Sequence, residues 1–175
     1  HSVKGGFAMS QSGSRADDNG TAGVVARPPL IFLSALALGS VTQHLLPLHF
    51  PSSRVGPAHW ISAVVAGTIL LGGVTVFVAG IRNFKAAATP IPTTQPSRVL
   101  VTTGIHGRTR NPIYVGMFLV YCGIGLLLRN PWVLILVLPL AITIRYGVVA
   151  REEAYLHRLF GDAYRVYQAR VPRWL

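Results

Sequence analysis

Two short segments of the sequence hold residues whose types and spacing could do chemistry. The first, residues 100–116, reads LVTTGIHGRTRNPIYVG, and the second is the adjacent pair Glu152 and Glu153. His106 could act as a general base near neutral pH, and Gly104 permits close approach of a ligand to the backbone. The two carboxylates could transfer a proton or bind a cation. The segments lie far apart in the chain, so the fold must bring them together.

The Glu pair needs a partner if it ends a helix, because the helix dipole disfavours negative charge there. Arg108, Arg110 or a bound cation could provide the positive charge, although the pair could equally be solvated charge at a helix end. Only one other acid, Asp162, lies outside the first 26 residues. The sequence therefore favours this pair as the acidic part of any site.

The elements that must position these residues are strongly apolar. Of the 175 residues, 51% are hydrophobic and 12% are charged, which is about half the charged share of a typical soluble domain. The mean hydropathy is +0.48. This composition excludes an ordinary water-soluble globule and a disordered chain.

Four long apolar runs predict four transmembrane helices. No charged residue lies between Arg27 and Arg54 or between Arg54 and Arg82, residues 111–128 carry none, and residues 130–150 carry only Arg145. Roughly 20 apolar residues cross a bilayer, which predicts spans near 30–48, 60–81, 113–128 and 132–150. The alternative, a soluble bundle of four buried helices, would leave a polar face on each helix.

The basic residues are distributed very unequally around these spans. Thirteen of the 16 Lys and Arg lie in the amino-terminal segment, the second connection and the tail, and only Arg54 and Arg129 lie in the other two connections. Because positive charge stays on the cytoplasmic side, we expect an integral membrane protein with both termini and the site in the cytoplasm, in contact with membrane lipids. The net charge of +11 then reflects topology, and nucleic acid is not expected as a partner.

The ends of the chain differ in character. Residues 1–26 are predicted to be disordered, with residues 1–8 a remnant of an expression vector, and residues 27–175 form a single transmembrane domain. The tail, residues 151–175, is predicted to be an interfacial amphipathic element with a helix break at Gly161 and a headgroup anchor at Trp174.

Packing of the spans follows from glycines and from one short connection. Glycines in the second and third spans predict close helix approach, and Pro139 predicts a kink in the fourth. The short connection around Arg129 makes the third and fourth spans an antiparallel hairpin in which facing residue numbers sum to about 259. Tyr114 would then lie level with Arg145. Asn111 could cap the third helix.

The sequence resembles the isoprenylcysteine carboxyl methyltransferase family and, more loosely, the related phospholipid N-methyltransferases. The resemblance covers roughly residues 80–175. It rests on the order of LVTTG at residues 100–104, RNPxYxG at residues 110–116, an apolar hairpin, Glu152-Glu153, FGxxYxxY at residues 160–167 and Val171-Pro172.

The resemblance implies a membrane methyltransferase that uses S-adenosyl-L-methionine and releases S-adenosyl-L-homocysteine. It implies an all-α fold of four transmembrane helices, with a cytoplasmic cofactor pocket formed by the second connection, the hairpin of the third and fourth helices and the tail. The cofactor-binding residues that we predict are Leu100, Val101, Gly104, His106, Arg110, Asn111, Pro112, Tyr114, Glu152 and Glu153.

The substrate side of the site is less defined. Val148 stands where the family has an Arg that serves the substrate carboxylate, and Arg145 or Arg151 could replace it. Arg145 is costly inside a span unless it faces a polar cavity, so we predict that it binds the anionic group of the substrate. His106 and Glu153 are the candidate general bases if the acceptor is an amine.

The methyl acceptor stays open among a prenylcysteine carboxylate, a phospholipid amine and a small apolar thiol, so a lipophilic or lipidated substrate is expected. Two other functions remain possible at this point: an NADPH-dependent enzyme similar to sterol reductases, and a membrane scaffold without activity. The histidines outside the site fit no metal-ligand spacing, and no metal is predicted. The oligomeric state is open.

Overall fold

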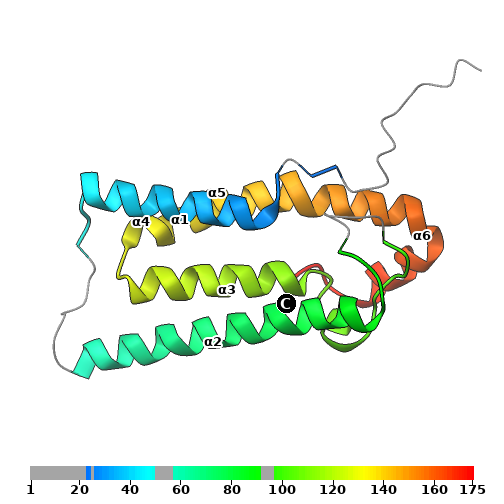
Figure 1. Ribbon diagram of the computed structural model, residues 1–175, viewed down its shortest axis with the longest axis horizontal. Coiled ribbons are helices and arrows are strands. Elements are labelled where there is room, and N and C mark those ends of the chain that lie inside the picture. Colours follow the sequence, from blue (N-terminus) through cyan, green and yellow to red (C-terminus); the bar gives the residue numbers. More distant parts are fainter. Residues whose placement is uncertain (1–22, 25, 50–56, 92–96) are drawn as a thin grey trace, which may run out of the picture.

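The structure, a computed structural model, describes residues 23–24, 26–49, 57–91 and 97–175. These residues are helical or irregular and contain no strand (Figure 1). The prediction of an all-α protein is therefore confirmed for this part of the chain. The predictions for residues 1–22 and 25 lie outside the described residues.

Helices occupy each of the four apolar runs. They are α1 (Pro28–Leu45), α2 (Pro57–Ala86), α3 (Pro112–Leu127) and, for the fourth run, α4 (Pro131–Ile135), α5 (Val137–Ile144) and the π-helix η2 (Arg145–Val149), which continues into α6 (Ala150–Arg170). A short 3-10 helix, η1 (Gly104–Gly107), precedes α3. Each of the four runs begins its helix at a proline, whose missing amide hydrogen costs nothing in the first turn.

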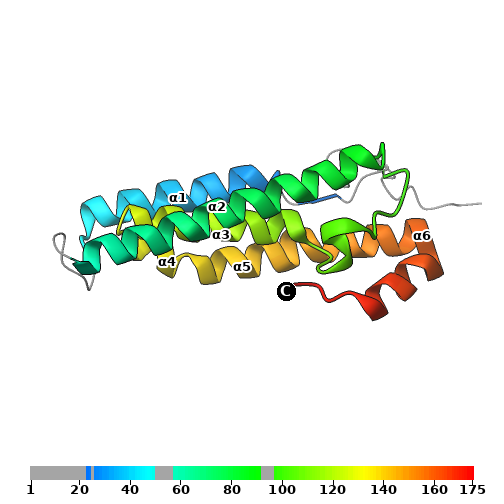
Figure 2. The same cartoon turned by 90° about the horizontal axis from the view of Figure 1, so that it is seen from below.

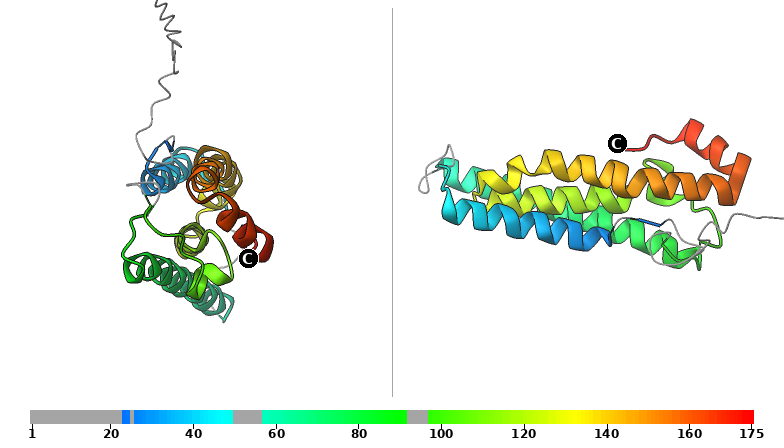
Figure 3. Two further views of the ribbon diagram at one scale, coloured as in Figure 1. Left: turned by 90° about the vertical axis from the view of Figure 1, so that its right-hand side faces the viewer. Right: turned by 90° about the horizontal axis from the view of Figure 1, so that it is seen from above.

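The helices lie nearly parallel in an elongated bundle. α3 runs through the middle, α2 packs along one side of it, and α1 with α4 and α5 covers the other side (Figures 1 and 2). The end-on view places α3 between α2 and the α1–α5 pair (Figure 3, left). The last part of α6 bends away at one end of the bundle, where the connection before α3 also lies.

Glycines allow α2 and α3 to approach closely, as predicted. A Cβ atom at Gly116 would lie 2.5 Å from the backbone nitrogen of Phe77, and one at Gly73 would lie 2.7 Å from the backbone nitrogen of Val120. Gly67 and Gly72, in contrast, have no neighbour within 4 Å of such an atom. Only some of the glycines in the second span therefore serve packing between helices.

The outer surface of the bundle is apolar. Leu33 of α1, Leu71 of α2 and Leu138 of α5 are 60%, 68% and 73% exposed. Two helical segments, His59–Ala86 and Pro131–Arg170, are long and apolar enough to cross a membrane, and both are mostly unburied within the molecule. α3 is a shorter apolar helix. Exposed apolar surface on this scale is typical of a membrane-facing protein.

The fourth apolar run is not a uniform α-helix. Asn130 caps its beginning by accepting a 3.1 Å hydrogen bond from the Val133 amide, and the α-helix is interrupted at Leu136, upstream of Pro139. A π turn follows at Arg145–Val149. The predicted break at Gly161 is confirmed, because this residue has φ +51° and ψ −122° and redirects α6. These irregularities decide where the two glutamates lie.

Candidate functional site

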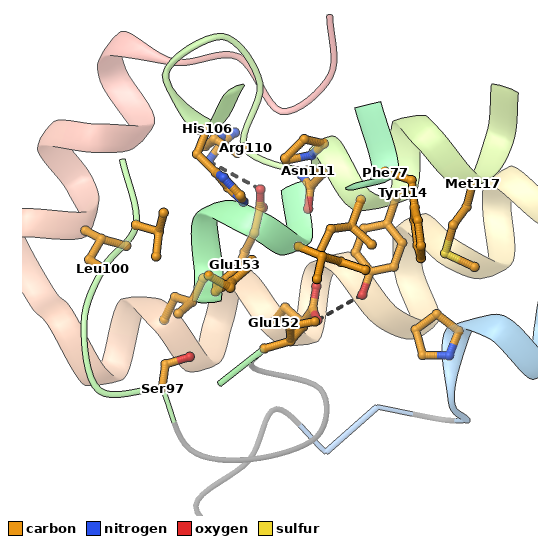
Figure 4. A pocket seen from close by; sticks show the side chains of 18 of the residues that line it. Phe77, Ser97, Leu100, His106, Arg110, Asn111, Tyr114, Met117, Glu152 and Glu153 are labelled. Carbon is orange, nitrogen blue, oxygen red and sulfur yellow. Dashed lines mark hydrogen bonds and ion pairs between the residues drawn. The ribbon is translucent and has the colours of Figure 1, made fainter. Parts of the chain in front are cut away.

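A cavity of about 720 Å³ opens at the end of the bundle where α6 bends. Its walls come from the beginning of α1, the end of α2, the connection that contains η1, the beginning of α3 and both parts of α6. Figure 4 shows polar side chains gathered around it, with Leu100 and Met117 toward opposite ends. Its size is in the range of small-molecule and cofactor sites.

Glu153 is neutralised by two arginines. The guanidinium of Arg173 donates to both carboxylate oxygens, from Nε to Oε1 at 3.0 Å and from Nη2 to Oε2 at 2.6 Å. Arg110 Nη1 lies 3.3 Å from Oε1 of the same carboxylate (Figure 4). The hydrogen bonds to Glu153 raise the pKa of Arg173. The carboxylate of Glu153 therefore forms a structural ion pair with these arginines.

Glu152 has a different environment. Its side chain is buried in the cavity wall and accepts one hydrogen bond, at 2.9 Å, from the Tyr114 hydroxyl (Figure 4). No ion pair to Glu152 occurs among the described residues. Burial without a compensating positive charge raises the pKa of the Glu152 carboxyl to about 8. A cationic ligand in the cavity would favour its ionised form.

His106 is buried and locked in η1. The amide of Asn83 donates at 2.8 Å to the Thr103 carbonyl oxygen and lies 3.3 Å from His106 Nδ1, so that Nδ1 accepts and Nε2 carries the hydrogen. The Phe84 ring packs edge-on against the imidazole at 4.9 Å. Burial lowers the pKa of His106 to about 4. The imidazole is neutral near pH 7, and its basic nitrogen is already used.

The carboxyl-terminal segment closes over the beginning of α3. The Arg110 amide donates to the Pro172 carbonyl oxygen at 2.9 Å. Thr109 Oγ1 and Asn111 Nδ2 both donate to the Arg173 carbonyl oxygen, at 3.1 and 3.0 Å. Asn111 therefore precedes α3 without capping it through its side chain, contrary to the prediction, because its amide binds the tail instead.

The structure brings nine of the predicted site residues together around the cavity. They are Leu100, Val101, His106, Arg110, Asn111, Pro112, Tyr114, Glu152 and Glu153. Gly104 is not in the wall. It lies beneath, with φ +59°, where a Cβ atom would collide with the Asn83 side chain. Its backbone freedom therefore serves the packing of η1 against α2 and not the approach of a ligand.

Arg145 lies outside the cavity wall. Its side chain is exposed, and its guanidinium carbon lies 5.4 Å from the centre of the Tyr146 ring. The prediction that Arg145 faces the site does not agree with this geometry, because the π turn changes the direction of the side chains that follow α5. Arg151, the other candidate, donates from Nη1 to the Gly23 carbonyl oxygen at 2.9 Å.

Three further residues at the site were not predicted from the sequence. Arg173 holds Glu153, Asn83 fixes His106, and Arg27 lines the cavity at the start of α1. Arg173 directly follows Val171-Pro172, so the family resemblance includes the two residues before it. Asn83 is a polar residue in the last turns of an apolar helix, a signal that could have marked it.

Known proteins resemble parts of this chain. Protein-S-isoprenylcysteine O-methyltransferase of Schizosaccharomyces pombe is 40% identical over 75 residues, which cover 42% of this chain and 31% of that protein. An uncharacterized protein of Haemophilus influenzae is 36% identical over 63 residues, which cover 36% of this chain and 100% of that protein. The chain thus matches less than a third of the length of the yeast relative.

No solved structure matches the chain significantly. The family profile described as phospholipid methyltransferase matches residues 61–163, which include both segments of the candidate site. The match to this profile and to the yeast enzyme confirms the resemblance predicted from the sequence. Together with the two long apolar helices, it indicates a membrane protein of a methyltransferase family. The chain belongs to the phospholipid methyltransferase family.

Proposed function

We propose that the protein is an integral membrane methyltransferase that uses S-adenosyl-L-methionine and methylates a lipophilic acceptor. The observation that carries this proposal is Glu152, a buried carboxylate in the cavity wall whose only hydrogen-bond donor among the described residues is the Tyr114 hydroxyl. When bound, S-adenosyl-L-methionine supplies a methyl group activated by a positively charged sulfonium.

The residues of the cavity fit such a cofactor. Glu152 and the Tyr114 ring offer a negative charge and an aromatic face to a cation. Arg110 Nη1 is ion-paired with Glu153, but Arg110 Nε is buried without a hydrogen-bond partner among the described residues, and a buried donor of this kind is suited to an incoming acceptor atom. Leu100 and Val101 supply an apolar wall for the flat adenine ring of the cofactor. S-adenosyl-L-homocysteine, the product, lacks the sulfonium charge that Glu152 would attract.

The acceptor chain fits the apolar part of the cavity wall. Leu30 of α1, Phe77 and Ile81 of α2 and Met117 of α3 form an apolar wall there. Burial of each methylene of an acyl or prenyl chain against such a wall contributes about 0.8 kcal/mol. The name of the yeast relative, an isoprenylcysteine methyltransferase, supports a lipidated acceptor.

In this proposal, the residues around the cavity mainly align the cofactor with the methyl acceptor and exclude water. The tail, held by Arg173 on Glu153 and by Asn111, covers the site on the side of α6. Methyl transfer needs a close, aligned nucleophile, and such alignment can supply several kcal/mol. His106 positions η1 through Asn83 and Tyr167, whose hydroxyl donates to the His106 carbonyl oxygen at 2.7 Å. We therefore assign His106 a positioning role in this proposal.

Ligand binding to the purified protein in detergent tests the proposal. S-adenosyl-L-homocysteine should raise the melting temperature, whereas NADPH should not. Glu152→Gln should weaken binding of S-adenosyl-L-methionine at least ~10-fold, a loss of about 1.4 kcal/mol, and should weaken binding of the uncharged product less. Asp162→Asn is the matched control, because Asp162 is an exposed acid paired with Arg165 outside the cavity.

Stabilisation by NADPH alone would replace the proposal with the reductase function, and no response to either ligand would leave a scaffold. Transfer of a labelled methyl group into a lipid extract and into a prenylcysteine analogue then identifies the acceptor. The role proposed for Glu152 is wrong if Glu152→Gln binds S-adenosyl-L-methionine as tightly as Asp162→Asn does.

A further inference from the structure

Two arginines line the cavity in the described part of the chain, and they differ in what they bind. Arg110 is held by Glu153 at 3.3 Å. Arg27, the residue before α1, is exposed, and its side chain has no ion pair or hydrogen bond among the described residues. Arg27 is therefore the cavity-lining arginine whose charge no carboxylate of the described residues compensates.

Gly23, Val24 and the backbone of Arg27 each make a contact at the site or with α1. Arg151, next to Glu152, donates from Nη1 to the Gly23 carbonyl oxygen at 2.9 Å. Val24 packs against the buried cluster that contains Tyr114 and Val149. The carbonyl oxygen of Arg27 accepts the first helical hydrogen bond of α1, from Leu30 at 2.9 Å. The backbone of Arg27 is thus held at the cavity before any ligand binds, which lowers the entropic cost of binding.

The local field also favours an anion at this position. The first turn of α1 contains no acidic residue, so the positive end of the helix dipole is uncompensated by the helix itself. Glu153 is paired with both Arg110 and Arg173, so this cluster leaves one positive charge uncompensated, and Arg27 adds a second at the cavity. A cationic cofactor compensates Glu152, and an anionic acceptor would compensate Arg27.

We propose that Arg27 binds the anionic group of the methyl acceptor and so selects amphiphiles with a negatively charged headgroup. This inference rests on the proposed function and assigns to Arg27 the role that the sequence had suggested for Arg145. The shared chemistry is an oxyanion, which is a carboxylate in a prenylcysteine and a phosphate in a phospholipid. The apolar chain would lie along Leu30 and Phe77, which line the same cavity as Arg27.

The test compares Arg27→Gln, Arg27→Lys and the wild-type protein with the matched control Arg170→Gln. Arg170 is an exposed arginine at the end of α6, outside the cavity wall. Three amphiphiles are used: N-acetyl-S-farnesylcysteine, its uncharged carboxamide as a ligand that cannot be methylated, and a short-chain phosphatidylethanolamine, whose zwitterionic headgroup contains an anionic phosphate. Binding of each amphiphile is measured by calorimetry without cofactor, and KM and kcat are measured where turnover occurs.

Arg27→Gln should weaken binding of the anionic acceptor, and raise its KM, about 10-fold, which is the loss expected for one charge-assisted hydrogen bond. The kcat, the affinity for the carboxamide and the affinity for S-adenosyl-L-homocysteine should stay within about twofold of wild type, and Arg27→Lys should recover most of the loss. The anionic acceptor whose binding depends on Arg27 identifies the oxyanion as carboxylate or phosphate.

Equal affinities of Arg27→Gln and Arg170→Gln for both anionic acceptors would overturn the inference, as would absence of acceptor binding by the wild-type protein. These results leave the proposed function standing if S-adenosyl-L-homocysteine still binds and methyl transfer is detected. Conversely, loss of cofactor binding in the wild type would reject the proposed function, while acceptor binding without cofactor would still decide the role of Arg27.

Discussion

Adjacent carboxylates of one helix are given opposite tasks by their neighbours. Glu153 is bound by Arg173 and Arg110, whereas Glu152 has the Tyr114 hydroxyl alone. Substituting Glu153 leaves two guanidinium groups without their carboxylate, while substituting Glu152 removes a buried acid whose pKa is raised to about 8 by burial. The first change should therefore act on stability and the second on ligand binding.

Glu153→Gln is expected to lower the free energy of unfolding by about 3 kcal/mol, because removal of one member of a largely buried ion pair leaves its partners uncompensated. Glu152→Gln should leave stability unchanged or raise it. Chemical denaturation in detergent micelles measures both. A Glu152→Gln protein that is the less stable of the two would contradict this division of roles.

His106 should make stability depend on pH. Burial lowers its pKa from 6.5 to about 4, so between these pH values the unfolded chain binds a proton that the folded protein does not. Stability contributed by this residue is therefore complete above pH 6.5 and is lost as the pH falls toward 4. The difference between these two pKa values corresponds to roughly 3 kcal/mol of stability.

The measurement is the free energy of unfolding at pH 7.5 and pH 5 for the wild type and for His106→Gln. The wild type should lose more stability than the variant over this interval. His157→Gln serves as the control, since His157 lies on α6 outside the main cavity. An equal pH dependence of wild type and His106→Gln would show that the buried imidazole is not the source.

At the scale of the elements, the contact of α2 with α3 depends on particular glycines. A Cβ atom at Gly116 would meet the Phe77 backbone, which cannot move without shifting α2, whereas one at Gly72 meets nothing within 4 Å. Gly116→Ala should therefore cost about 1–3 kcal/mol through overpacking. Gly72→Ala should be neutral or stabilise slightly, because alanine is the better helix former.

Thermal unfolding of the two variants, followed by circular dichroism, measures this difference. Gly116 is two residues from Tyr114, so a shift of α3 should also weaken binding of S-adenosyl-L-homocysteine. If both alanine variants melt at the same temperature, the close approach of the two helices does not contribute as described.

The register between α3 and the fourth apolar run could be predicted from the sequence only near the connection that joins them. Near the connection the predicted sum of about 259 holds, since a Cβ atom at Gly125 would lie 2.8 Å from the Leu134 side chain. Further along it fails, because Tyr114 reaches Glu152 and not Arg145. The arithmetic assumed a uniform helical rise, whereas the interruption at Leu136 and the π turn at Arg145–Val149 place more residues in the same length.

The helices and the residue types of the site were predictable because apolar runs, prolines and a cluster of polar residues are local signals. The partners were not. Arg173 reaches Glu153 only because Gly161, with φ +51°, turns α6 back toward the bundle. Arg27 joins the cavity only because α1 packs beside α4 and α5. Contacts of this kind depend on the assembled fold and leave no mark on sequence spacing.

At the scale of the whole molecule, charge is separated from apolar surface along the bundle axis. Arg27, Arg110, Arg151 and Arg173 all lie at the end that holds the cavity, and Arg129 lies in the connection at the opposite end of α3. The apolar residues exposed on α1, α2 and α5 lie between these ends. A bilayer that covers the middle of the bundle would put the site at one membrane surface.

We expect the cavity end to face the cytoplasm, because the basic residues of the sequence are 13 to 2 in favour of that side. Single cysteines report orientation, and Cys122 must first be replaced by alanine because it is the one native cysteine. His49, in the connection after α1, and Arg170, at the end of α6, are exposed positions at opposite ends of the bundle, and each is replaced by cysteine as His49→Cys or Arg170→Cys.

A membrane-impermeant maleimide should label residue 49 in right-side-out vesicles and residue 170 only in inverted vesicles. Labelling of both positions from one side would mean that the bundle does not cross the bilayer along its long axis. The reverse labelling pattern would place the site outside the cytoplasm, where S-adenosyl-L-methionine would need another source.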